Sequence, residues 1–339
     1  MKSRIKHACL AMLLMAGAPA AASAGTIVDA IKARGELVCG VNTGLGGFSI
    51  ADSTGKWVGL DVDVCHAVAA ALLGDGNKVK FVPLNAQQRF TALQSGEVDM
   101  LSRNTTWTLT RDTQLGLNFT AITFFDGQGF MVAKKAGVKS AKELAGASVC
   151  VQPGTTTELN LADYFRANNM QYKPVVIENI AEVNAAFFAG RCDALTTDAS
   201  GLASVRKNDA KNPDDYVILP EIISKEPLGP AVAQGDEQWT DIVRWTVFAL
   251  LEAEEFGITQ ANVEEMAKTS TNPNIKRVLG ATPGMGKALG VDEDWVVKAV
   301  KSVGNYGEVW TRNITPLGLP RGVNNLWNKG GLMYAPPIR

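Results

Sequence analysis

The chain alternates short apolar runs with longer stretches that have a helical period. Leu37–Val41 and Val79–Val82 have the composition of buried strands. Between them, Val64, Val68 and Leu72 recur at every fourth residue, which predicts a helix with one buried stripe that ends at Gly74. Strands that alternate with helices in this way predict an α/β protein.

One segment pattern occurs twice along the chain. In each copy a helix-like run leads through a glycine turn into a short strand, which opens into small polar residues, Ser102–Thr106 in one copy and Thr196–Asp198 in the other. Upstream of each copy, another strand runs into a loop rich in glycine and threonine, at 42–47 and at 152–157. Parallel α/β sheets bind ligands beyond the carboxyl ends of their strands. The repeat therefore predicts two α/β lobes with a ligand held between their polar loops.

The first 24 residues have the pattern of a signal peptide. Lys2, Arg4 and Lys6 form a basic start, an apolar core follows, and Ala22-Ser-Ala24 has the small side chains of a cleavage site. We expect export to the periplasm and cleavage after Ala24, which leaves 315 residues. No later apolar run reaches membrane length, so we expect the mature chain to be soluble.

The composition of the mature chain narrows its possible partners. Three of the 33 basic residues lie in the signal peptide, so the mature chain carries 30 basic and 34 acidic residues and a net charge of −4. Without a basic tract, nucleic acid is not an expected partner. Four cysteines remain, and an even number after an export signal favours disulfides, in any of three pairings. Their wide spacing does not fit a zinc site, and we expect no metal.

Several motifs together resemble one known family. Gly59-Leu-Asp-Val-Asp63, followed by an alanine-rich helix, resembles the signature of family 3 solute-binding proteins of ABC importers for polar amino acids. Thr108-Leu-Thr-Arg111 resembles the segment of this family that binds the ligand carboxylate. The amino-acid sequences of segments 42–46, 102–107 and 226–230 are similar to those of the general L-amino-acid-binding branch of this family. The resemblance covers nearly all of 25–339 and implies a two-lobed type II periplasmic-binding-protein fold, with two α/β domains joined by two crossover strands.

The resemblance also implies where the lobes divide. With crossovers near Asp126–Met131 and Ile223–Pro230, the first lobe holds 25–128 and 229–339, and the second holds 129–228. The tail is longer than a minimal family member needs, and 258–304 is expected to be an elaboration of the first lobe.

This division leads to a prediction for the disulfides. Cys39 on the first strand is expected to pair with Cys65 in the helix that covers it. Cys150 and Cys192, both expected on strands of the second lobe, form the other pair. Bridges between lobes would hinder their closure.

The resemblance assigns ligand-binding roles to eight residues. Arg111 and the amides of Thr155 and Thr156 are expected to hold the ligand carboxylate, and Asp198 the ammonium group. Asn104 and Thr106 match positions that contact the ligand through backbone and side chain, and Arg103 is expected near the ligand side chain. Many relatives stack an aromatic ring on the ligand where this chain has Leu45, so the leucine favours a permissive pocket.

Plain structural roles compete with these assignments. Thr155 lies three residues before Glu158, which is the spacing of a capping box that starts a helix. Asp198 has the residue type of a helix N-cap. Arg111 could pair with Asp112 or Asp126 at the surface.

The leading hypothesis is the binding component of an ABC importer, a monomer that closes on one free L-amino acid and delivers it to permease subunits in the inner membrane. No catalytic residue is expected, because a triad would need His66, the one histidine of the mature chain. No cofactor is expected, and Gly44-Leu-Gly-Gly47 is too short and wrongly placed for a dinucleotide loop. The alternative is a periplasmic enzyme on the same fold, such as a cyclohexadienyl or prephenate dehydratase. It would need an acid at the ligand, for which Glu158 is the one candidate. A sensory domain is a third class, against which the lack of a membrane-spanning run argues.

Overall fold

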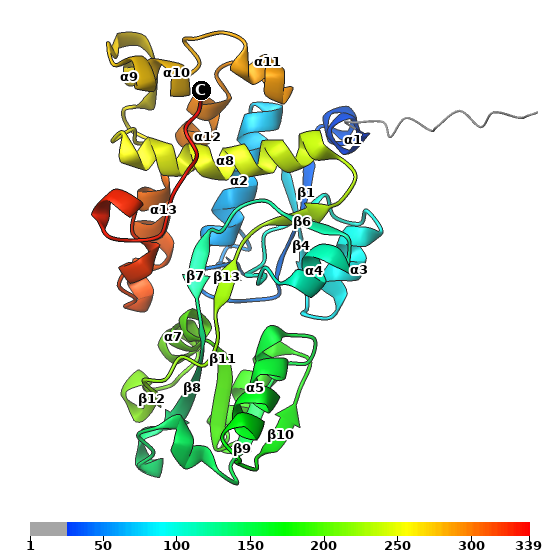
Figure 1. Ribbon diagram of the computed structural model, residues 1–339, viewed down its shortest axis with the longest axis vertical. Helices are drawn as coiled ribbons and strands as arrows, with labels where there is room; N and C mark the ends of the chain where they lie inside the picture. Colours follow the sequence, from blue (N-terminus) through cyan, green and yellow to red (C-terminus); the bar gives the residue numbers. More distant parts are fainter. Residues whose placement is uncertain (1–25) are drawn as a thin grey trace, which may run out of the picture.

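The computed structural model describes residues 26–339, and the expected signal peptide 1–24 lies outside the described residues. Two α/β lobes lie one above the other, joined by two extended strands (Figure 1). The upper lobe in this view contains both the start and the end of the described chain. The expected fold class, a two-lobed type II periplasmic-binding-protein fold, is confirmed.

The first lobe is built on a five-stranded mixed sheet. Its first three strands are parallel, and the fourth runs antiparallel to both of its neighbours. In spatial order the strands are β4 (Val79–Leu84), β1 (Leu37–Asn42), β5 (Met100–Leu101), β14 (Ala231–Ala233) and β6 (Leu117–Phe119). A separate small hairpin follows β1 and consists of β2 (Ile50–Ala51) and β3 (Trp57–Val58).

The second lobe repeats this arrangement in a second five-stranded sheet. Its order is β10 (Lys173–Val176), β9 (Ser148–Val151), β11 (Ala194–Asp198), β8 (Gln128–Ala133) and β12 (Tyr216–Ile218). Here too the first three strands are parallel and the fourth is antiparallel to its neighbours. The two segments that echo each other in the sequence therefore form strands at matching places: β1 matches β9, and β5 matches β11.

Two strands connect the lobes side by side. β7 (Phe124–Asp126) and β13 (Glu226–Leu228) form an antiparallel pair, with Glu226 opposite Asp126 (Figure 1). β7 continues into β8 of the second sheet, and β13 leads back to β14 of the first. We propose the lobe limits 25–128 with 229–339, and 129–228, on this connectivity.

Helices cover the faces of both sheets. Those of the second lobe are α5 (Thr156–Ala167), α6 (Ile180–Phe188), α7 (Ala199–Asn208) and the short 3-10 helices η1 (Lys134–Ala136), η2 (Ala141–Leu144) and η3 (Pro213–Asp215). The first lobe begins with α1 (Thr26–Arg34), α2 (Leu60–Leu73), α3 (Gln88–Gln94) and α4 (Leu109–Thr113). It is completed by α8 (Glu237–Glu255), α9 (Val263–Thr269), α10 (Pro273–Val278), α11 (Met285–Leu289), α12 (Trp295–Val303), α13 (Tyr306–Asn313), η4 (Thr315–Leu317), η5 (Gly322–Asn324) and η6 (Trp327–Lys329).

The expectation that α2 has a single buried stripe is wrong. Eleven of its fourteen residues are buried, including the alanines at 67 and 69–71. α12, from the predicted elaboration, packs along α2 with α8 beside it, and buries Val296 and Val300 in the same core. Alanines permit this close approach of helices because they have no bulky side chain. The small face of α2 is therefore a contact surface for a helix more than 200 positions later in the chain.

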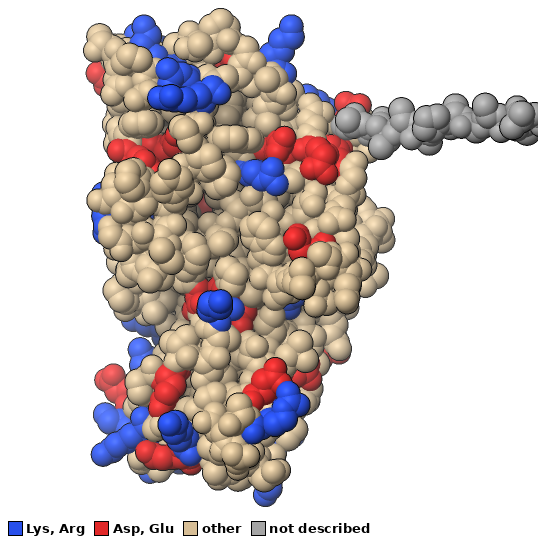
Figure 2. Space-filling model, in the orientation of Figure 1, with Lys and Arg blue, Asp and Glu red and all other residues tan. Residues whose placement is uncertain are grey.

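Within 26–339 no helix is both long enough and apolar enough to cross a membrane. Charged side chains of both signs intermix on the face seen in Figure 2.

Both predicted disulfides are confirmed. Cys39 on β1 bonds Cys65 in α2, and Cys150 on β9 bonds Cys192. The expectation that Cys192 lies on a strand is wrong, because strand pairing starts two residues later, at Ala194. Cys192 lies in the turn after α6, where Gly190 has a positive φ of 74°.

The two disulfides should contribute separately to stability. Replacing Cys150 and Cys192 with alanine should lower the free energy of unfolding by about 2–4 kcal/mol, because the unfolded chain regains the entropy of an open loop. The Cys39–Cys65 pair encloses a sequence separation of 26 rather than 42, so its removal should cost slightly less. Denaturant unfolding of both double variants measures this, and a loss below about 1 kcal/mol would contradict the expectation.

Candidate functional site

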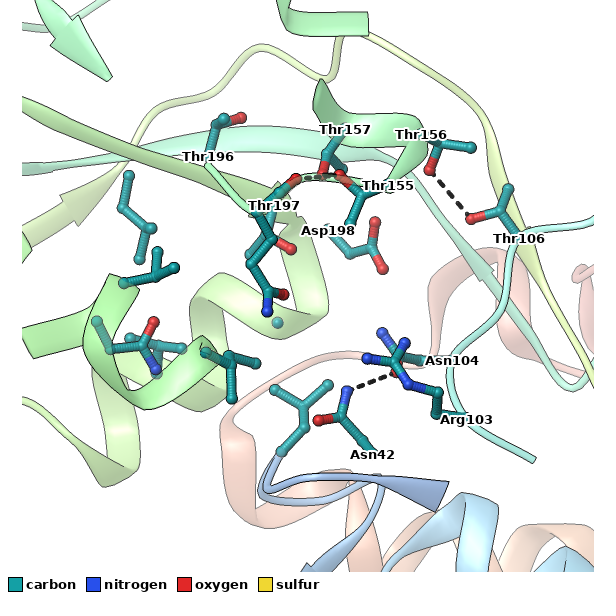
Figure 3. A pocket seen from close by; sticks show the side chains of 18 of the residues that line it. Asn42, Arg103, Asn104, Thr106, Thr155, Thr156, Thr157, Thr196, Thr197 and Asp198 are labelled. Atoms are coloured by element: carbon teal, nitrogen blue, oxygen red, sulfur yellow. Dashed lines mark hydrogen bonds between the residues drawn. The ribbon is translucent and has the colours of Figure 1, made fainter. Parts of the chain in front are cut away.

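A cavity lies between the lobes at the carboxyl ends of β1, β5, β9 and β11 (Figure 3). Its wall includes seven of the eight predicted ligand-binding residues and several that sequence reasoning missed. The predicted ones are Leu45, Arg103, Asn104, Thr106, Thr155, Thr156 and Asp198. The others are Asn42, Arg89, Gln152, Thr157, Ile180, Val183, Asn184, Leu195, Thr196, Thr197, Gly201 and Val205.

The loop after β5 is held in a special conformation. Asn104 has a positive φ of 36°, a region that asparagine tolerates better than most residues. Its backbone N–H donates to the buried Asp61 carboxylate at 2.8 Å, and the Asn42 amide donates to its side-chain oxygen at 2.9 Å. Burial raises the pKa of Asp61 to about 7, while Asn104 and Arg103 partly oppose the rise. The Asp61 of the sequence signature therefore shapes the ligand loop from beneath.

Arg111 does not line the cavity wall. Its Nη1 donates to the Thr106 carbonyl at 2.9 Å, and its guanidinium group lies over the Phe90 ring. The alternative of a surface ion pair with Asp112 or Asp126 is wrong, because the side chain is buried. Burial lowers the pKa of Arg111 to about 10, and the carboxylates of Glu226 and Asp198 oppose this. Arg111 thus lies one layer behind Thr106.

Arg103 is the predicted arginine that does reach the wall. Its Nε donates to the Leu84 carbonyl at 2.9 Å, which fixes the guanidinium plane at the cavity (Figure 3). Burial lowers its pKa to about 10, an effect that Asp61 opposes.

Arg89 is a wall residue that the sequence analysis missed. Its Nη1 donates to the Thr105 hydroxyl at 3.3 Å, but its buried Nε has no protein partner within the described residues. Burial holds its pKa well below the usual range, and the nearby guanidinium groups of Arg103 and Arg111 add to this. A buried guanidinium nitrogen without an acceptor favours an anionic ligand group. Arg89 lies in the first turn of α3, which begins at Gln88.

The second lobe presents the N-terminus of α5 to the cavity. Thr155 is the N-cap, and its hydroxyl accepts the Glu158 N–H at 3.0 Å. The capping box is incomplete, because the Glu158 carboxylate accepts the backbone N–H of Gly154 and not that of Thr155. Thr155, Thr156 and Thr157 all line the wall, where free N–H groups of a first helical turn suit a carboxylate.

Asp198 does not cap α7 with its side chain, so the N-cap alternative is wrong in this respect. Asp126 of β7 does so instead, since it accepts the backbone N–H and the hydroxyl of Ser200. Burial raises the pKa of Asp198 well above its usual value, and the neighbouring carboxylates of Asp126 and Glu226 raise it further. Burial also raises the pKa of Asp126, to about 6. A carboxylate of this kind is stabilised by an incoming cation.

Hydrogen bonds across the cleft join the two lobes. The Ser204 hydroxyl of α7 donates to the Gly46 carbonyl at 2.8 Å, and the Asn85 amide donates to Glu178. The hydroxyl oxygens of Thr106, in the first lobe, and Thr156, in the second, lie 3.3 Å apart (Figure 3), and each hydroxyl donates its proton to Glu226. The structure therefore shows the lobes in a closed arrangement.

The cavity also has an apolar side and a histidine-free wall. Leu45, Val183 and Leu195 line it, whereas Phe48 packs edge-on against Phe124 in the first-lobe core.

His66 lies on α2, where its ring contacts Phe81. Within 26–339 no group of three or more candidate ligands is placed to hold a metal ion.

Comparison with known proteins identifies the family. Residues 37–261 match the bacterial extracellular solute-binding proteins, family 3. This chain belongs to that family. The solute-binding protein is 61% identical to the general L-amino acid-binding periplasmic protein AapJ of Rhizobium johnstonii, with 100% of each chain covered. It is 57% identical to the glutamate/glutamine/aspartate/asparagine-binding protein BztA of Rhodobacter capsulatus, covering 98% of this chain and 99% of that protein.

Solved structures give the same family assignment. A periplasmic binding protein from Brucella ovis with glutathione bound superposes on this solute-binding protein with a TM-score of 0.90. The two are 62% identical over 92% of this chain and 99% of the other. An ancestral amino acid-binding protein described as a precursor of cyclohexadienyl dehydratase is 30% identical, with a TM-score of 0.57 over 68% of this chain and 94% of that one.

Proposed function

We propose that this solute-binding protein is the periplasmic component of an ABC importer and closes its lobes around a free L-amino acid. The observation that carries the proposal is the pairing of opposite charges in one closed cavity. The buried carboxylate of Asp198 lies in the same wall as the N-terminus of α5 and two arginines. An amino acid carries an ammonium and a carboxylate on one carbon, and these two ends match such a wall.

Each end of the amino acid has proposed partners. The carboxylate binds the first-turn N–H groups at Thr155 and Thr156. Arg111, one layer behind Thr106, is a further proposed partner, which its guanidinium group reaches once a ligand fills the cavity. Only one guanidinium nitrogen of Arg111 has a protein acceptor among residues 26–339, so donors remain for a ligand. The ammonium group binds Asp198, with Asn104 and Thr106 beside it.

The side-chain end of the cavity is mixed in character, which supports broad specificity. Leu45 offers apolar contact, and Arg103 and Arg89 offer positive charge. AapJ is named for general L-amino acid binding, and BztA for acidic amino acids and their amides. We therefore propose a wide range of ligands in which glutamate and aspartate are well bound.

Binding fits the site better than catalysis does. A dehydratase needs an acid at the ligand, and the expected candidate, Glu158, instead accepts the Gly154 N–H outside the cavity wall. Asp198 is the acid in the wall within the described residues, and the ammonium group of an amino acid occupies it.

Export and partners complete the proposal. AapJ and the Brucella ovis protein are both named as periplasmic, and we propose the same compartment for this protein, with the expected signal peptide cleaved after Ala24. The closed monomer docks on the permease subunits in the inner membrane and releases its amino acid there.

A binding screen tests the function. Mature protein, unfolded and refolded to remove bound ligand, should be stabilised by several L-amino acids, by about 2.7 kcal/mol at a ligand concentration 100 times Kd.

Arg111→Ala should lose about 2–5 kcal/mol of binding free energy because it removes a charge-assisted pair in a desolvated cleft. Arg166→Ala, an exposed change on α5, is the matched control. Turnover of prephenate without stabilisation by any amino acid would transfer the assignment to the enzyme.

Arg89 should determine how well acidic side chains bind. Arg89→Met keeps the length of the side chain but removes its charge, so the affinity for glutamate and aspartate should fall about 10- to 100-fold. Leucine should bind with little change, and Arg89→Lys should restore part of the loss. Titration calorimetry with glutamate, glutamine and leucine measures this, and an equal loss for all three would contradict a side-chain role.

Binding should strengthen as pH rises. The pKa of Asp198 is raised in the free protein, and a bound ammonium group favours the ionised form, so binding releases protons. Affinity should therefore increase as pH rises above the usual range of an aspartate pKa and through the raised pKa of Asp198. Calorimetry in buffers of different ionisation enthalpy counts the protons. Asp198→Asn should bind weakly and lose most of the slope. Glu252→Gln should keep the slope, since burial raises the pKa of Glu252 to about 7 but this residue does not line the cavity.

A further inference from the structure

One carboxylate joins both lobes and the hinge without lining the cavity. Glu226 is the first residue of β13, the crossover strand that returns the chain to the first lobe. Its side chain is 1% exposed, although it carries a charge at the boundary of two domains. Neither the ligand contacts proposed above nor the sequence motifs assign it a role.

Four donors surround this carboxylate and satisfy both of its oxygens. Oε2 accepts the hydroxyls of Thr106 at 2.6 Å and Thr156 at 2.8 Å. Oε1 accepts the Asn160 amide at 2.8 Å and the Ser224 hydroxyl at 2.7 Å. Thr106 belongs to the first lobe, Thr156 and Asn160 to α5 of the second, and Ser224 to the segment leading into β13.

We propose that Glu226 is a positioning residue that latches the closed state and orients two hydroxyls in the ligand site. The proposal rests on the proposed function, because the ligand it serves is an amino acid. Opening the lobes moves α5 away from Thr106, so Glu226 must lose its hydrogen bonds to at least one of the two lobes. A buried carboxylate that loses hydrogen-bond donors is destabilised. The closed state is therefore favoured by the free energy of the hydrogen bonds that opening breaks.

The same bonds fix the chemistry that Thr106 and Thr156 present to the ligand. A hydroxyl has a single proton, and in both residues it is directed at Glu226. Each oxygen therefore offers only lone pairs to the cavity, which suits the N–H groups of an ammonium and not the oxygens of a carboxylate. Carboxylate binding is left to the backbone amides and Arg111. Glu226 thus sets which end of the amino acid lies beside these hydroxyls.

Two variants separate the latch from a merely structural carboxylate. Glu226→Gln keeps the shape but removes the charge, and its amide nitrogen replaces one acceptor oxygen with a donor, so it can no longer accept from all four groups that surround the carboxylate. Asn160→Ala removes one of the two hydrogen bonds that α5 donates to Glu226. Asn160 belongs neither to the cavity wall nor to the paired crossover strands. Asp163→Asn is the matched control, because it makes the same charge change on an exposed position of α5.

Stopped-flow dissociation of glutamate and small-angle X-ray scattering of the ligand-free protein test the proposal. Glu226→Gln should release glutamate about 10- to 100-fold faster with little change in the association rate. Asn160→Ala should do so severalfold, and both variants should increase the radius of gyration without ligand. Asp163→Asn should match the wild type.

The outcomes distinguish this proposal from the function on which it rests. Failure of the wild type to bind any amino acid overturns the proposed function, and the scattering comparison still tests the latch. Unchanged dissociation and an unchanged radius of gyration in Asn160→Ala overturn the latch, even if Glu226→Gln does not fold. Unchanged dissociation in a folded Glu226→Gln overturns it as well.

Discussion

The burial of charges of both signs at the meeting of the lobes is the constraint on which the site depends. Arg89, Arg103 and Arg111 come from the first lobe, whereas Asp198 ends a strand of the second. Burial lowers the pKa of each guanidinium group and raises that of Asp198, so each set needs the other or a ligand. A zwitterion with an anionic side chain supplies both signs in one small molecule. Closure on such a ligand therefore compensates charges that neither lobe can satisfy alone.

The repeated topology makes this arrangement possible. β5 and β11 occupy the same position in their two sheets and point their polar ends into one cavity. Each disulfide lies within one lobe, so neither of them ties the two lobes to each other. The packing of α12 on α2 adds a helix to the first-lobe core without adding residues to the cavity wall.

The sequence predicts those features of the fold and the site that neighbouring residues determine. The strand-to-loop echoes locate both halves of the cavity, because a strand end and its polar loop are set by neighbouring residues. Arg89 was missed because its place in the wall depends on how α3 packs at the cleft, which the residues next to it do not indicate. The alanine face of α2 and the bonds of Glu226 escaped for a different reason. Their partners lie far away in the chain, and periodicity carries no information about such contacts. Arg111 was expected in the wall, and its bond to the Thr106 carbonyl places it one layer back.

The crossover strands do more than connect the lobes. Asp126 and Glu226 face each other in the β7–β13 pair, and each fastens one helix of the second lobe. Asp126 accepts from Ser200 at the start of α7, and Glu226 from Thr156 at the start of α5. These helix starts flank the ligand, α5 through its amides and α7 through the adjacent Asp198. Buried hydrogen bonds therefore tie both helix starts to the crossover pair. The second-lobe partners proposed for the ammonium and the carboxylate are thus held by one strand pair, so a broad range of side chains is compatible with one fixed geometry for the amino-acid backbone.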